Sequence, residues 1–91
     1  MEMKEAFKND SYKVLNVSLK MGETMPLHKA SSDAFVINRK GKGRISFSNR
    51  EVILSEGDTV IIKANEPHRM EILEDFSSSI ILEPDAKIDF V

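Results

Sequence analysis

The sequence predicts a single domain built entirely from β-strands. Short segments that alternate apolar and polar residues, or that are apolar throughout, recur at a spacing of roughly 8–12 residues with turn residues between them. No segment carries a helical repeat of apolar residues long enough to bury one face. The 91 residues amount to one domain, so we expect residues 1–91 to form a single unit with a core at about 12–83, a short N-terminal arm and a C-terminal tail.

The first half of the chain predicts an arm, two strands and two turns. Met1–Asn9 forms either a short helical turn or an extended arm. Tyr12–Leu19 alternates apolar and polar residues, which is typical of a strand with one buried face, and Met21–Glu23 then turns the chain. Ala34–Asn38 is apolar on both faces, as expected for a strand that lies between a core and a second layer or subunit. Glycines predict a further turn at Gly41–Gly43.

The second half predicts a hairpin and three more strands. Arg44–Ser48 and Glu51–Leu54 alternate on either side of Asn49-Arg50, which favours a tight hairpin turn there. The remaining apolar segments predict strands at Val60–Ile62, His68–Ile72 and Phe76–Leu82, with turns at Glu56–Asp58, Asn65–Pro67 and Glu74-Asp75. Pro84 ends the last strand, since proline cannot donate to a strand ladder.

Composition and charge argue against several functional classes. The net charge is −2, and the 13 basic and 15 acidic side chains are interspersed, so no nucleic-acid partner is expected. The densest basic segment, Arg39–Arg44, is interpreted as a solvated hairpin tip, with an anion site at the turn as the alternative. Cysteine is absent, which excludes disulfides and thiol chemistry. No apolar run approaches the roughly 20 residues of a membrane span, so we expect a cytoplasmic protein with no membrane contact.

Two segments resemble the paired motifs of the cupin family. In the first segment, Gly22, His28 and Gly41 fall at the spacing of the first cupin motif, and in the second segment Gly57 and His68 match the second motif. The motifs occur in order, and the resemblance extends from about residue 15 to residue 82. It implies an antiparallel β-barrel of the cupin type, a jelly roll also described as a double-stranded β-helix.

The resemblance implies a metal site that this chain keeps only in part. In metal-dependent cupins three histidines and one glutamate hold a divalent metal, and this sequence matches them only at His28 and His68. Ala30 and Ala34 stand at the positions of the other histidine and the glutamate. A tight zinc or iron site takes three or more protein ligands. We therefore expect no cofactor, with a divalent metal on the two histidines as the less favoured alternative.

The resemblance also implies an enclosed pocket across which the two imidazoles face each other. Its expected lining comprises His28, His68, Ala30, Ala34, Val36, Met70 and Ile72. An apolar pocket of this kind suits a small, mainly apolar or planar ligand with one or two acceptors. The alternative is a pair of partly buried, hydrogen-bonded histidines without a ligand. Met25 and Met70 are interpreted as core-filling residues; Met25 could reach inward, but a thioether suits only soft metals.

Three functions remain open at this point. The favoured one is a small cupin-fold protein, non-catalytic or of unassigned activity, that binds a small molecule in the barrel cavity without the usual four-ligand metal site. The second is a metal-dependent enzyme of the dioxygenase, isomerase or epimerase type that uses His28 and His68. The third is a dimeric sensor or interaction module, because apolar residues at Phe35, Ile37 and Ile61 suggest a homodimer interface. No catalytic residue is assigned.

Overall fold

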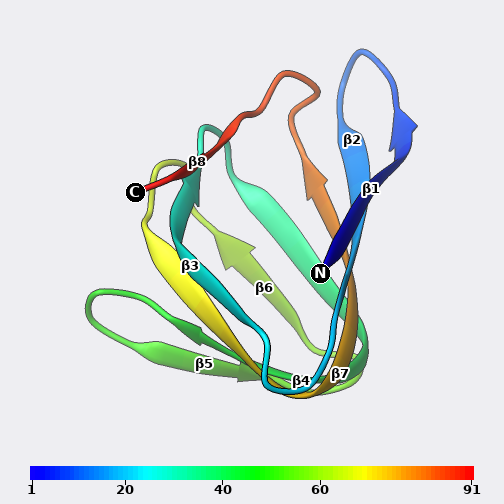
Figure 1. The fold of residues 1–91 in the computed structure, drawn as a ribbon. Helices are drawn as coiled ribbons and strands as arrows, with labels where there is room; N and C mark the ends of the chain where they lie inside the picture. Colours follow the sequence, from blue (N-terminus) through cyan, green and yellow to red (C-terminus); the bar gives the residue numbers. More distant parts are fainter.

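All 91 residues are described in the computed structural model, and they form eight β-strands without a helix (Figure 1). The strands are β1 (Glu2–Lys8), β2 (Lys13–Leu19), β3 (Thr24–Ala30), β4 (Ala34–Ser46), β5 (Glu51–Leu54), β6 (Thr59–Ile62), β7 (His68–Leu82) and β8 (Ile88–Phe90). Every pairing between them is antiparallel. The all-β prediction is confirmed. The structure contains no helix with the length and apolar composition needed to span a membrane.

The two long strands β4 and β7 organise the whole sheet. They pair with each other along most of their length, and each half of the pair has different outer neighbours. In one half, which forms the first layer, β6 lies beside β4, and β2 and then β1 lie beside β7. In the other half, which forms the second layer, β5 lies beside β4, and β3 and then β8 lie beside β7. The single sheet therefore curls into two facing layers that share their central strands, as a jelly roll does (Figure 1).

Two of the predicted turns are wrong, and they lie opposite each other in the structure. Gly41–Gly43 is the middle of β4, and Glu74-Asp75 is the middle of β7. The register between the strands shifts several times around Lys42 and Glu74, which marks β-bulges. Bulges bend and twist a strand pair without ending it. The residues that resemble turn signals therefore form the bend at which the sheet passes from one layer to the other.

The basic segment around Gly41 is accordingly not a hairpin tip. Lys42 forms an ion pair with Glu74 on the neighbouring strand, with its Nζ 3.8 Å from the carboxylate. Arg44 pairs with Glu71 on β7 and, at 3.8 Å, with Glu51 on β5. These cations balance carboxylates on the outer face of the sheet.

Both ends of the chain add edge strands. The N-terminal arm is extended, because β1 pairs with β2 through a register shift between Glu5 and Phe7. The C-terminal tail contributes β8, whose residue Ile88 pairs with Ala30 at the end of β3. The tail thus lies along one wall of the second layer.

The hydrophobic core fills the space between the two layers. Alternation along each strand sends one set of side chains inward, so that Val36 and Ile62 are buried whereas their neighbours Phe35 and Ile61 face outward. The core cluster comprises Leu15, Val17, Leu19, Met25, Ala34, Val36, Ile45, Phe47, Leu54, Ile62, Ile72, Phe76, Leu82 and Ala86.

One buried polar residue stabilises the bend. Asn38 is fully buried, and its Nδ2 donates to the carbonyl oxygens of Gly41 at 2.8 Å and Leu54 at 3.4 Å. The hydroxyl of Ser78 donates to Asn38 Oδ1 at 3.2 Å. Buried carbonyls near bulges lose their ladder partners, and this amide replaces them. No pattern in the sequence distinguishes Asn38 from the other polar residues.

Candidate functional site

The two histidines lie side by side on neighbouring strands of the second layer. His28 on β3 and His68 on β7 are register partners, and their ring centroids are 4.2 Å apart at an interplanar angle of 60°. Both side chains are buried. The expectation that the rings face each other across a cavity is wrong in its geometry, because the rings share one wall and contact each other.

A bulge in β3 places a methionine on the same wall. The register between β3 and β7 shifts between Met25 and His28, so that Met25 pairs with Met70 while His28 pairs with His68. Strict alternation would send residues three positions apart to opposite faces. Because of the bulge, Met25 and His28 are both buried. No periodicity rule could have found this pair, since the bulge exists only once β3 is paired.

Each imidazole is held by the backbone of its own strand. Nδ1 of His28 lies 2.7 Å from the carbonyl oxygen of Pro26, and Nδ1 of His68 lies 2.9 Å from that of Glu66. A carbonyl can only accept, so each Nδ1 donates, and in the neutral ring Nε2 carries the lone pair. Neither Nε2 has a partner in the protein. No fully buried polar side-chain atom lacks a partner, so both Nε2 atoms touch accessible space.

The environment of His68 favours its neutral form. Burial lowers the pKa of His68, and the nearby His28 lowers it further. The bond to the Glu66 carbonyl and the charge of Glu66 oppose this shift without cancelling it. At neutral pH, His68 therefore offers an unprotonated Nε2.

A mostly enclosed cavity of about 50 Å³ lies next to the histidines, between the two layers. Ten of its thirteen lining residues are hydrophobic, and the lining comprises Met3, Val17, Met25, His28, Val36, Ile45, Ile62, His68, Met70, Phe76, Ser78, Ile80 and Ile88. The residues expected there from the sequence divide into two groups. His28, His68, Val36 and Met70 border the cavity, whereas Ala30, Ala34 and Ile72 are buried elsewhere in the interior.

The C-terminal strand covers the His28 end of the cavity. Ile88 lines the cavity, and Phe90 pairs with His28 so that the two ring centroids lie 5.5 Å apart. The amide of Val91 donates to the carbonyl of Leu27 at 3.0 Å. Phe90 itself is more than half exposed. A short, partly exposed strand is therefore all that separates His28 from solvent on this side.

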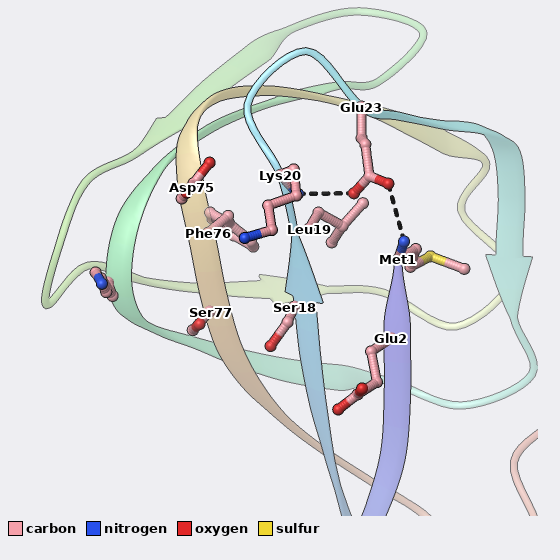
Figure 2. A pocket seen from close by; sticks show the side chains of 10 residues that line it. Met1, Glu2, Ser18, Leu19, Lys20, Glu23, Asp75, Phe76 and Ser77 are labelled. Atoms are coloured by element: carbon pink, nitrogen blue, oxygen red, sulfur yellow. Dashed lines mark hydrogen bonds and ion pairs between the residues drawn. The ribbon is translucent and has the colours of Figure 1, made fainter.

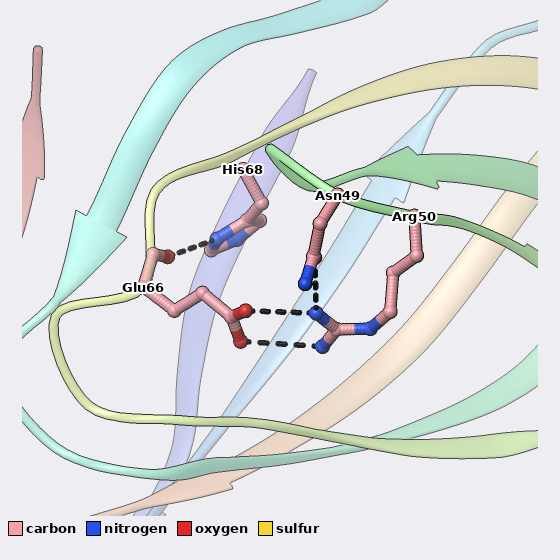
Figure 3. A network of polar contacts seen from close by, with 4 residues as sticks. All are labelled: Asn49, Arg50, Glu66 and His68. Atoms are coloured by element: carbon pink, nitrogen blue, oxygen red, sulfur yellow. Dashed lines mark hydrogen bonds and ion pairs between the residues drawn. The ribbon is translucent and has the colours of Figure 1, made fainter.

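A second contact network lies beside His68, and Figure 3 shows its polar part. Phe47 packs against His68 with ring centroids 5.9 Å apart, and the Arg50 guanidinium lies 3.8 Å over the Phe47 ring. Arg50 makes two hydrogen bonds to the Glu66 carboxylate, at 2.9 and 3.3 Å. These bonds lower the pKa of Glu66 and raise the pKa of Arg50. The network joins the β4–β5 hairpin to the loop before β7.

The structure has no group of three or more His, Cys, Asp or Glu side chains placed so that they could hold a metal ion. Zinc and iron sites in proteins use at least three such ligands. The histidine pair therefore does not fit the divalent metal that the resemblance to metal-dependent cupins implies.

Two larger hollows lie on the surface and lack this chemistry. One, of about 540 Å³, is lined by polar residues around Glu23, which accepts hydrogen bonds from the Met1 ammonium at 2.9 Å and the Lys20 amide at 2.7 Å (Figure 2). The ammonium lowers the pKa of Glu23. The other, of about 470 Å³, runs over the outside of β3 and β7 and includes Met25 and Met70 in its border.

Comparison with known proteins identifies related folds. The model of a family described as Cupin domain matches residues 15–82. A conserved protein of unknown function from Streptococcus pyogenes has a TM-score of 0.80 and 21% identity, over 92% of this chain and 75% of that chain. A cupin superfamily protein from Desulfitobacterium hafniense has a TM-score of 0.83 and 18% identity, over 92% of this chain and 77% of that chain.

A third structure is an enzyme by its description. The DMSP lyase DddQ from Ruegeria pomeroyi has a TM-score of 0.83 and 17% identity, over 91% of this chain and 44% of that chain. Identities this low show a shared fold only. The comparison with curated proteins gave no match.

Proposed function

This chain belongs to the cupin domain family, and on that premise we propose that it binds a small ligand in the cavity beside His28 and His68, as a binding protein rather than an enzyme. Its structural relatives include both a lyase and a protein of unknown function, so the fold does not choose between binding and catalysis. The lining favours binding, because the two histidines are its only titratable side chains.

The free Nε2 atoms carry the proposal. Each Nε2 touches accessible space and has no partner in the protein, and an acceptor left without a partner in an apolar environment costs about 1–3 kcal/mol. A ligand that donates a hydrogen bond removes this cost, whereas a ligand with acceptors alone does not. The sequence predicts a ligand with hydrogen-bond acceptors, whereas the ligand proposed here carries a donor. The reason is that both Nδ1 donors already bind backbone carbonyls.

The size of the cavity limits the ligand. Its volume of about 50 Å³ is far below the roughly 300–1,000 Å³ of pockets that hold drug-sized molecules. A ligand of a few heavy atoms with one hydroxyl or N–H group fits this space. A larger ligand requires β8 to leave β3, which uncovers the side of the cavity bordered by Ile88.

A titration with two molecules of nearly equal size tests the proposal. 2-Propanol donates and accepts hydrogen bonds, whereas acetone only accepts. The chain has only two histidines, so their imidazole signals are easily separated by NMR. We expect 2-propanol, and not acetone, to shift both sets of imidazole signals, and the binding to be lost in His68→Phe. Equal responses to the two molecules, or responses confined to other residues, would refute it.

We also infer that the outer face of the first layer binds a second copy of the chain. An apolar row crosses all five strands of that layer through successive register partners. The row comprises Phe7, Val14, Ile81, Phe35 and Ile61. Phe7, Phe35 and Ile61 are substantially exposed. A two-fold axis through the row would set apolar side chains of one copy against those of the other.

Light scattering across a concentration series tests the dimer. We expect a dimer for the wild type and a monomer for Phe35→Lys and Ile61→Lys. The control is Ile53→Lys, because Ile53 is equally exposed but lies on β5 in the other layer. A wild-type monomer throughout the series, or dissociation caused equally by Ile53→Lys, would exclude this interface.

A further inference from the structure

Two of the three methionines that line the cavity lie on the same wall as the two histidines. Met25 and Met70 are register partners on β3 and β7, as His28 and His68 are. Directly paired residues in antiparallel strands have side chains about 4.5–5.5 Å apart at Cβ. All four residues line the same cavity. Strand pairing therefore brings two thioethers and two imidazoles together around one small space.

The chemistry of these four groups is that of a soft metal site. Thioether sulfur and imidazole nitrogen are ligands of Cu(I), and thioethers in particular select it over harder ions. Each Nε2 is free for this role, because each Nδ1 is occupied by a backbone carbonyl. Such hydrogen bonds to the second ring nitrogen also orient histidine ligands in known metal sites.

The charge of the lining favours a monovalent ion. No carboxylate borders the cavity, and most of its lining is hydrophobic. Burying a charge without a compensating partner is costly, and a divalent ion would bring twice the charge of a monovalent one into this site. A neutral set of two nitrogen and two sulfur ligands is thus better suited to Cu(I) than to zinc or ferrous iron.

The position of the methionines gives the ion a route from solvent. Met25 and Met70 are the two residues shared by the cavity and by the open hollow outside β3 and β7. The β3 bulge interrupts the pairing of the two strands directly after Met25. Methionine side chains are unbranched and flexible, so an ion can pass them without a change in the fold.

From this arrangement we propose that Met25, Met70, His28 and His68 bind one Cu(I) ion, through the two Sδ and the two Nε2 atoms. The inference rests on the proposed function in that it uses the same cavity. It replaces the divalent site of metal-dependent cupins with a different metal and a different ligand set.

The test is an anaerobic competition of the purified chain against a chromogenic Cu(I) chelator. We expect one Cu(I) per chain. Met25→Leu and Met70→Leu keep the side-chain volume but remove the sulfur, and each should weaken Cu(I) binding by about 10–100-fold or more, the loss typical of even outer-shell changes. Met21→Leu is the matched control, because Met21 is 68% exposed and lies outside the cavity.

A second measurement uses only the wild type. X-ray absorption at the copper edge should show both sulfur and nitrogen neighbours around the bound ion. Copper bound without sulfur neighbours would overturn the proposal even if the leucine variants failed to fold. Absence of Cu(I) binding, or equal affinities in Met25→Leu, Met70→Leu and Met21→Leu, would do the same.

The outcomes separate this inference from the proposed function. Imidazole shifts with 2-propanol but no copper binding would overturn the metal site alone. Methionine-dependent copper binding without a response to 2-propanol would overturn the hydrogen-bond-donor ligand and leave the metal site standing.

Discussion

Replacing Gly41 with alanine should destabilise the protein far more than the same change at Gly57. Both glycines have a positive φ, 80° and 87°, so alanine incurs the left-handed penalty of about 1–2 kcal/mol at either position. The reduced freedom of the unfolded chain returns about 0.4–1 kcal/mol. At Gly57 an added Cβ meets nothing within 4 Å, so the net cost there should be about 1 kcal/mol.

Gly41 differs because another strand occupies the space. Its added Cβ would lie 1.8 Å from the carbonyl oxygen of Asp75, whereas carbon and oxygen approach no closer than about 3.3 Å even in weak hydrogen bonds. β4 and β7 would have to separate at the bend. Overpacking costs about 1–3 kcal/mol, and each buried carbonyl left without a donor adds about 1–3 kcal/mol. With the net backbone cost of about 1 kcal/mol, the total should be about 3–7 kcal/mol, a large share of the about 5–15 kcal/mol of a typical domain.

Urea unfolding followed by far-ultraviolet circular dichroism measures both variants, since the chain has no tryptophan. Gly41→Ala should unfold at a much lower urea concentration than Gly57→Ala, with a similar dependence of the free energy on urea. If the two variants lose stability within about 0.5 kcal/mol of each other, about the scatter of ordinary surface substitutions, then β4 and β7 are not packed at the bend as described.

Two further predictions concern buried polar groups. Burial lowers the pKa of His68 in the folded protein. As the pH falls through the ordinary histidine range, His68 therefore takes up a proton in the unfolded chain before it does so in the folded protein. The free energy of unfolding should therefore decrease from about pH 7.5 to about pH 5.5, and this dependence on pH should be weaker in His68→Phe. Urea unfolding at several pH values measures it, and the same pH dependence in both proteins would contradict the prediction. Asn38→Ala should lower the free energy of unfolding by about 2–4 kcal/mol, because the carbonyls of Gly41 and Leu54 lose the Asn38 amide as a donor. Ser78→Ala should lower it by only about 1 kcal/mol. The same urea assay measures both variants, and equal losses would contradict the central role of the Asn38 amide.

Local sequence patterns predicted the strands well where pairing is local. The β4–β5 hairpin is confirmed, but its tight turn lies one residue earlier than Asn49-Arg50, because Ser46 pairs with Glu51 and the Phe47 amide donates to the Arg50 carbonyl. The patterns failed at Gly41–Gly43 and Glu74-Asp75, where the same residue types form bulges in long strands. A bulge and a turn use the same backbone freedom, and only the partner strand decides between them. That partner is more than 30 residues away along the chain, beyond the reach of any local rule.

The site was predictable to the same degree. Motif spacing located His28 and His68, and the structure confirms that they lie together. The partnership of Met25 with the histidines depends on the β3 bulge, so alternation could not predict it. The closure of the cavity by Ile88 and Phe90 depends on the tail pairing with β3, and a tail of three strand residues carries too weak a pattern to be assigned a partner.

Ala34 shows why small residues at the positions of metal ligands do not by themselves make a large pocket. Its register partners are Ile62 on one side and Leu82 on the other, and it is buried in the core cluster. Protein interiors pack as densely as organic crystals, so these larger neighbours fill the space that a longer side chain would take. What changes at this position is charge. With alanine at this position, where the resemblance to metal-dependent cupins implies a glutamate, no carboxylate extends from it toward the cavity, and none borders the cavity from elsewhere. We therefore expect such a lining to stabilise hydrogen-bond donors and soft monovalent ions, and we propose that this electrostatic consequence, more than the volume, distinguishes the site from a divalent metal centre.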